Sequence, residues 1–181
     1  MQGELAKRLG MRAKNAYNFL DMVKDKEANK LRNFIFGGED SLVSTLGLLF
    51  GIASVSIFSR TEIFITGLIA ITVEAFSMGA GSFLSEDTAQ AIAENPNKTE
   101  SPKIDGVIMF FSYITFGLIP LWPFLVFDIT LAKYISGGTT LIALYILGYL
   151  PAKNPKQGMK MVVVAGLAAL MGFVVAYFFS L

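Results

Sequence analysis

Three side chains that can ligate a metal ion stand within apolar sequence: Asp40, Glu74 and Met78. Glu74 separates two uncharged runs of 11 residues, 63–73 and 75–85. At about 1.5 Å per residue each run reaches only about 17 Å, whereas a bilayer core of about 30 Å needs about 20 residues. If this stretch spans a membrane, Glu74 must lie deep inside it. Carboxylates at that depth usually face a bundle interior or a water-filled path and mark ion or proton routes.

Two carboxylates and one thioether form a ligand set of mixed hardness. Oxygen ligands alone suit Mg²⁺ or Ca²⁺, whereas a thioether shifts the preference toward Fe²⁺, with Mn²⁺, Co²⁺ and Zn²⁺ close by. Without His or Cys the site cannot bind very tightly, which suits a transporter because the ion must also leave. A desolvated Glu74 is expected to be protonated when no cation is near. We therefore hypothesise that Glu74, together with Asp40, exchanges protons for metal.

Both Glu74 and Met78 have ordinary alternatives. A buried glutamate can be a structural acid that is hydrogen-bonded inside a helix bundle, and a lone methionine in an apolar span is usually core packing. Met78 follows Glu74 by four residues, so the two share one helix face. This spacing favours the metal site.

The composition predicts that these residues belong to an integral membrane protein. The 181 residues are 54% hydrophobic and 16% charged, and the mean hydropathy is positive, unlike an average soluble domain. The lack of Cys and His excludes disulfides, zinc fingers, Cys-ligated iron–sulfur clusters and Cys/His nucleophiles. No nucleophile–base pair or cofactor motif is present, so we expect neither an enzyme nor a resident cofactor. A net charge of +1 gives no support to nucleic-acid binding.

The expected fold is all-α, with a surface helix followed by five membrane spans. Residues 1–32 carry eight Lys and Arg among apolar residues at three- and four-residue steps, and no cleavable signal is evident. This segment is predicted to lie on the membrane as an amphipathic helix, acting either as a gate at the cytoplasmic mouth or as an orientation signal. The transmembrane domain, 33–181, is predicted to have spans at about 33–59, 62–85, 106–127, 134–152 and 160–181.

The turn at 59–61 is so short that the first two spans must form an antiparallel hairpin. Counted from this turn, Asp40 lies about 28 Å along the first helix and Met78 about 24 Å along the second. Both residues then fall in one layer near one membrane face, with Glu74 one turn deeper. The hairpin can therefore bring the three ligating side chains together.

Glycines in the first span suggest two further features. Gly37 and Gly38 are expected to loosen the helix just before Asp40. Gly47 and Gly51 form a GxxxG pattern, which permits close approach of another helix. That helix can belong to the same chain or to a second copy.

The distribution of positive charge predicts a cytoplasmic N-terminus and an outside C-terminus. With this orientation only Arg60 and Lys133 of the 15 Lys and Arg lie outside, in accord with the positive-inside rule. The layer of Asp40 and Met78 then lies toward the cytoplasm. Beyond the second span, a group of acidic residues is either an entry funnel for cations or a solvated helix end. The residues of this candidate entry are Glu86, Asp87 and Glu94.

At these residues the chain resembles the vacuolar iron transporter family. The matching stretches are LRNFIFGGEDSLVSTLGLLFGIA, AFSMGAGSFLS, TFGLIPLWPFLV and GMKMVVVAGLAALMGFVVAYF, and the likeness covers about residues 30–181. The resemblance implies a homodimer of five-helix protomers whose path is lined by the first two spans of both subunits. It also implies export of Fe²⁺, and often Mn²⁺, from the cytosol in exchange for protons. The membrane would be vacuolar in a eukaryote and the plasma membrane in a prokaryote. Asp40 and Met78 match the family's intramembrane metal ligands.

The chain departs from the family pattern in two places. Family members commonly have a glutamate two turns before the methionine, where this chain has Ala70, so the equivalence of Glu74 is an inference. Many members also carry a helical, carboxylate-rich cytoplasmic domain between the second and third spans, where this chain has only about 20 residues. The cytoplasmic metal-binding part of the family pattern is then absent, or it is reduced to the candidate entry residues and Glu100.

The sequence therefore predicts a homodimeric, proton-coupled exporter of Fe²⁺ or Mn²⁺. The alternative from a different class is a non-transporting membrane scaffold or metal-sensing module.

Overall fold

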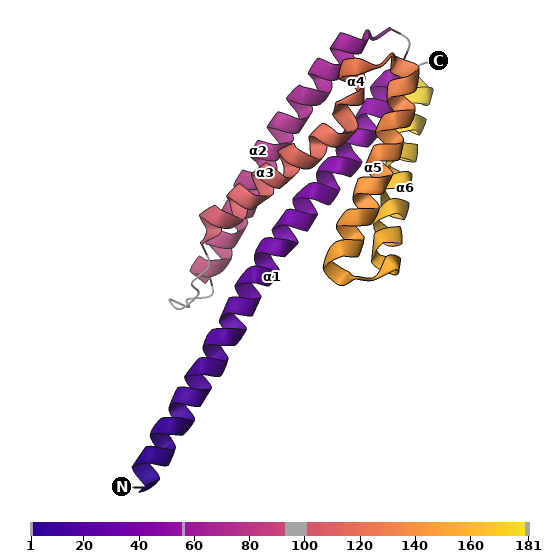
Figure 1. The fold of residues 1–181 in the computed structure, drawn as a ribbon. Helices are drawn as coiled ribbons and strands as arrows, with labels where there is room; N and C mark the ends of the chain where they lie inside the picture. The colour runs from indigo at the N-terminus through magenta and orange to yellow at the C-terminus, as the bar shows by residue number, and fades with distance from the viewer. Residues whose placement is uncertain (1, 56, 93–100, 180–181) are drawn as a thin grey trace. The chain divides into compact units, whose positions relative to one another are not determined.

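A computed structural model describes residues 2–55, 57–92 and 101–179. The described residues form helices and turns without a strand, which confirms the all-α class. The helices (Figure 1) are α1 (Gln2–Ser54), α2 (Arg60–Ile92), α3 (Pro102–Leu121), α4 (Pro123–Val126), α5 (Ile129–Ala152) and α6 (Pro155–Phe179). The chain divides into two compact units, Met1–Arg32 and Asn33–Leu181.

Four helices of the described part are long and apolar enough to cross a membrane. They are Glu27–Ser54 within α1, then α2, α3 and α5, and they correspond to the first four expected spans. α6 is a 25-residue helix that covers most of the fifth expected span. That this helix crosses the membrane stays a prediction. The amphipathic character of residues 1–32 also stays a prediction, because the side chains of 2–26 lie outside the described part.

One face of α2 packs against α3. The buried residues of α2 recur at every fourth position, which follows one side of a helix. They are Ile63, Gly67, Ile71, Ala75 and Gly79. The two backbones approach each other closely at a pair of glycines. A Cβ added to Gly106 would lie 2.6 Å from the carbonyl oxygen of Gly79. This packing fixes which side of α2 faces the interior of the bundle.

The glycines before Asp40 serve packing and do not interrupt the helix. α1 continues through Gly37 and Gly38, so these residues do not break the helix, and the expected loosening stays a prediction. A Cβ on Gly38 would lie 2.7 Å from the ring of Phe116, and one on Gly37 would lie 2.9 Å from the sulfur of Met109. Both glycines therefore let α1 approach α3.

The GxxxG pattern of α1 packs against α6 of the same chain. A Cβ added to Gly47 or Gly51 would lie 3.5 Å from the carbonyl oxygen of Ala168 or Gly172, respectively. In the opposite direction, a Cβ on Gly172 would lie 2.6 Å from the carbonyl oxygen of Gly47. Of the two alternatives for this pattern, the structure shows the intramolecular contact.

The third expected span, 106–127, is broken before its end. α3 ends at Leu121 and the four-residue α4 begins at Pro123, because proline has no N–H to continue the helical ladder. The hydroxyl of Ser136 in α5 donates to the carbonyl oxygen of Pro120 at 2.7 Å. A neighbouring helix thus satisfies a backbone group beside the break.

α5 begins at Ile129, five residues before the expected start of the fourth span at 134. Asp128 is its N-cap, and the carboxylate accepts the N–H of Leu131 at 3.1 Å. A capping aspartate satisfies a backbone donor that the first helical turn leaves free. The earlier start therefore follows from a local capping signal and not from hydropathy.

α2 begins with a capping box, in which a serine and a glutamate three residues later bond reciprocally. The N–H and hydroxyl of Ser59 donate to Oε2 of Glu62 at 2.7 and 2.6 Å, and the N–H of Glu62 donates to Oγ of Ser59 at 3.3 Å. Beside it, Nη1 of Arg60 donates to the carbonyl oxygen of Val126 at 3.3 Å. These bonds fix the turn of the hairpin next to α4.

Ser59→Ala is expected to lower the midpoint of thermal unfolding in detergent by about 2–4 °C, because the first turn of α2 loses its cap. Circular dichroism measures this midpoint. The control is Ser85→Ala, since that hydroxyl donates only to the Ser82 carbonyl of its own helix. Equal midpoints for the two variants would show that the cap contributes nothing to the fold.

Candidate functional site

The first two spans are antiparallel, and a side-chain hydrogen bond joins them beside the predicted site residues. The hydroxyl of Ser44 in α1 donates to Oε2 of Glu74 in α2 at 3.3 Å. Asp40 stands four residues before Ser44, and Met78 stands four residues after Glu74. In an ideal antiparallel pair of helices, the same register would place Asp40 opposite Met78 one turn further along.

The carboxylate of Glu74 is turned into the bundle. The hydroxyl of Tyr113 in α3 donates to its Oε2, and this hydroxyl lies 2.7 Å from that of Ser44. We call Ser44, Glu74 and Tyr113 the polar cluster. It joins α1, α2 and α3 by side-chain hydrogen bonds, so the acid faces other helices, as a carboxylate inside a membrane is expected to do.

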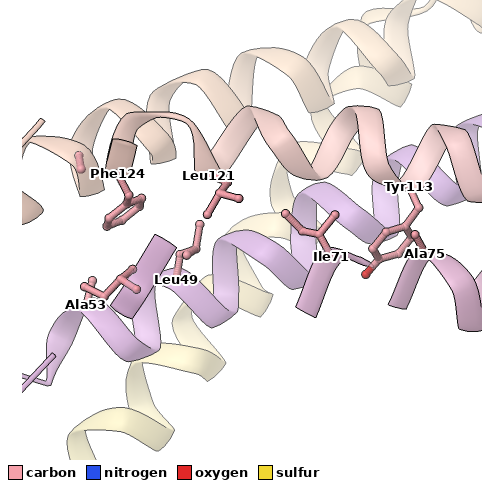
Figure 2. Close-up of a cluster of buried hydrophobic side chains, with 9 residues drawn as sticks. Leu49, Ala53, Ile71, Ala75, Tyr113, Leu121 and Phe124 are labelled. Atoms are coloured by element: carbon pink, nitrogen blue, oxygen red, sulfur yellow. The ribbon is translucent and has the colours of Figure 1, made fainter. Parts of the chain in front are cut away.

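Tyr113 is held firmly in place. Its side chain is only 1% exposed, and its ring extends from α3 to lie beside Ile71 and Ala75 of α2 (Figure 2). The hydroxyl of Ser41 donates to its carbonyl oxygen at 2.6 Å. The apolar cluster around it continues through Leu49 and Leu121. Tyr113 therefore brings a hydroxyl from an apolar core to the edge of the predicted site.

Asp40 lies one helical turn before Ser44 of the polar cluster. It is half-buried, and a negative charge on it and one on Glu74 would repel each other. The adjacent Glu39 is also half-buried and adds a further repulsion with Asp40. Negative charges gathered in apolar surroundings are costly unless a cation or protons neutralise them. Asp40, Glu39 and Glu74 thus bring three carboxylates into one half-buried part of α1 and α2.

Met78 lies half-buried on α2 and packs against the apolar cluster that contains Ala75 and Tyr113. Within the described ranges, no group of three or more His, Cys, Asp or Glu side chains is placed to hold a metal ion. The predicted ligand set has only two carboxylates, Asp40 and Glu74, with the sulfur of Met78. Its role in metal binding stays a prediction.

The candidate entry residues lie on the last turns of α2 and beyond. Glu86 is half-buried, and its Oε1 accepts Nε2 of Gln90 at 3.0 Å. Asp87 is exposed. Glu94 and Glu100 lie outside the described residues. An entry role for this group also stays a prediction.

Reasoning from sequence missed Ser44 and Tyr113 as site residues. The sequence did carry a signal for Tyr113, namely its unusual depth. Tyrosines of membrane proteins gather at the interfaces, but Tyr113 stands well inside the third expected span. A hydroxyl at that depth needs a hydrogen-bond partner. Ser44 carried no such signal, since serine also occurs in helix contacts of every kind.

Comparison with known proteins identifies the family. No curated protein matches the chain at a significant level. A family model described as the VIT family matches residues 31–105 and 90–177. These two matches include Asp40, Glu74, Met78 and Tyr113, and together they cover most of the chain. The chain therefore belongs to the VIT family, the family of vacuolar iron transporters.

Proposed function

We propose that this protein is a homodimeric, proton-coupled transporter that exports Fe²⁺ or Mn²⁺ from the cytosol. Membership of the VIT family supports transport of metal ions across a membrane. The observation that carries the proposal is the carboxylate of Glu74, which hydrogen-bonds to side chains of two other helices and interacts electrostatically with Asp40.

In this mechanism Asp40 and Glu74 carry the exchanged charge, and Met78 supplies a softer ligand. A divalent cation bound beside the two carboxylates removes their repulsion. When the cation leaves, protons take its place, because two uncompensated charges in apolar surroundings are unstable. Metal movement in one direction is thereby linked to proton movement in the other. The predominance of Lys and Arg on the predicted cytoplasmic side supports loading from the cytosol.

The proposal is tested with purified protein in lipid vesicles that have an acidic lumen. Fe²⁺ or Mn²⁺ is added outside, and the metal content and internal pH are followed together. We expect the metal to accumulate while the internal pH rises, and Asp40→Ala to abolish both changes. If folded wild-type protein moved neither ion in vesicles that keep their pH gradient, the transport proposal would be wrong and the protein would be a scaffold or sensor.

Met78→Leu is expected to impair Fe²⁺ transport more than Mn²⁺ transport. Leucine keeps the volume of the side chain but removes the sulfur, which favours the softer of the two ions. We expect the KM for Fe²⁺ to rise several-fold and the KM for Mn²⁺ to change by less than about twofold. Competition between the two ions in the vesicle assay measures this ratio.

The control for Met78→Leu is Met161→Leu. Met161 is also half-buried, but it packs against a different apolar cluster, with Leu144 and Leu147. Met161→Leu should leave the ratio of the KM for Fe²⁺ to the KM for Mn²⁺ unchanged. An equal effect of Met78→Leu on both ions would assign Met78 to core packing alone.

A further inference from the structure

The hydrogen bonds of the polar cluster treat the two oxygens of Glu74 differently. Tyr113 and Ser44 both bond to Oε2, and neither of these bonds ends on Oε1. Among the residues that the structure describes, Oε2 is therefore the oxygen that the protein holds, and Oε1 is the oxygen that can meet a further ligand. Asp40 interacts electrostatically with Glu74 and stands one helical turn before Ser44 in α1, so its carboxylate is the candidate to share that ligand.

Both groups that hold Glu74 are neutral hydroxyls. A lysine or arginine in this place would neutralise the carboxylate and compete with a cationic cargo. A hydroxyl instead fixes the orientation of the carboxylate and leaves its charge available. The polar cluster thus has the chemistry of a support for a cation ligand.

Tyr113 is more rigid than the glutamate that it holds. Its ring is buried against α2, and Ser41 bonds its carbonyl oxygen at 2.6 Å. Gly117 makes this bond possible, since a Cβ there would lie 2.6 Å from Oγ of Ser41. A glutamate, by contrast, has a flexible side chain whose ordering costs free energy when a ligand binds. A fixed donor already holds the glutamate in one conformation before the ion binds. The free energy of ordering the side chain is then not lost on binding, which raises the affinity for the ion.

We infer that Tyr113 is a positioning residue of the transport site. Its hydroxyl holds Oε2 of Glu74 so that Oε1 and Asp40 meet the same divalent cation, and α3 thereby contributes to a site otherwise built from α1 and α2. This inference rests on the proposed function, because it assigns Glu74 to the cargo.

The test is Tyr113→Phe, which keeps the buried ring and removes only the hydroxyl. For Mn²⁺ transport in vesicles we expect KM to rise about tenfold, the usual effect of losing a hydrogen bond to a charged group. The maximal rate should stay within experimental error. The midpoint of thermal unfolding should fall by only a few degrees, because the loss of one buried hydrogen bond leaves the ring packing intact. Ser44→Ala should raise KM less, since its bond to Glu74 is long, at 3.3 Å, and Tyr113 remains.

The matched control is Tyr145→Phe, because Tyr145 stacks on Tyr149 in α5 and is not part of the polar cluster. Its KM should equal that of the wild type. An unchanged KM for Tyr113→Phe would overturn the inference. A lowered unfolding midpoint with an unchanged KM would equally overturn it, since the hydroxyl would then be only structural.

A second measurement separates this inference from the proposed function. Mn²⁺ binding to the purified protein in detergent is measured for the wild type, Tyr113→Phe, Glu74→Gln and the double variant. If Tyr113 acts through Glu74, its substitution weakens binding in the wild type and adds nothing in the Glu74→Gln protein. Additive losses would overturn the inference even if transport were confirmed. A wild type that binds Mn²⁺ but transports none would overturn the proposed function while binding still tests Tyr113.

Discussion

Glu74→Gln is expected to remove the dependence of metal transport on the pH gradient. Glutamine has nearly the same shape as glutamate, but its amide neither carries a negative charge nor exchanges a proton at neutral pH. The cation then loses one of its two charged ligands, and the leaving cation is no longer replaced by a proton at this residue. We expect gradient-driven uptake of Mn²⁺ to fall about a hundredfold, which corresponds to about 2.7 kcal/mol.

Uptake of Mn²⁺ and the internal pH are measured in the same vesicles with the gradient imposed and with it collapsed. The control is Glu62→Gln, the same substitution on the same helix, where glutamine still completes the capping box with Ser59. It should transport like the wild type. If Glu74→Gln kept the wild-type response to the gradient, another group would couple protons to metal.

Gly79→Ala is expected to cause the largest loss of folded protein. The added Cβ would lie 2.9 Å from the carbonyl oxygen of Gly106 and 3.0 Å from Cβ of Phe110. Neither atom is the free end of a flexible side chain, so α2 and α3 must separate. Overpacking of this kind costs about 1–3 kcal/mol, which corresponds to a fall of about 3–10 °C in the unfolding midpoint. Because Gly79 adjoins Met78, transport should fall as well.

The control for Gly79→Ala is Gly81→Ala in the same helix. A Cβ on Gly81 would meet nothing within 4 Å, and alanine favours a helix over glycine by up to about 1 kcal/mol. This variant should therefore be as stable as the wild type or more stable. Equal unfolding midpoints for the two alanine variants, measured in the same detergent, would refute the close contact between α2 and α3.

The sequence predicts the helices better than it predicts their ends. Long apolar runs identify four spans because the thickness of the bilayer sets their length. The ends depend on single residues: Asp128 caps α5 earlier than hydropathy suggests, and Pro123 breaks the third span. The packing role of Gly37 and Gly38 was missed because glycine both weakens a helix and admits a neighbour. Only the position of α3 decides between these effects.

The candidate site, too, could be predicted from the sequence only in part. Glu74 stands out in the sequence, because a carboxylate between two apolar runs has no ordinary place in lipid. Periodicity also places Met78 on its helix face. The partners of Glu74 could not be predicted, because Ser44 and Tyr113 are 30 and 39 residues away from it and come from other helices. Such contacts depend on helix rotation, which hydropathy does not determine.

The contact of Gly47 and Gly51 with α6 also limits how copies of this protein can associate. A groove of small residues admits one helix at such short range, and here α6 already fills it. The GxxxG motif, which commonly joins identical transmembrane helices, thus forms a contact within a single polypeptide. Bulky replacements in this groove would damage the protomer itself, so loss of a dimer in such variants would say nothing about where two subunits meet.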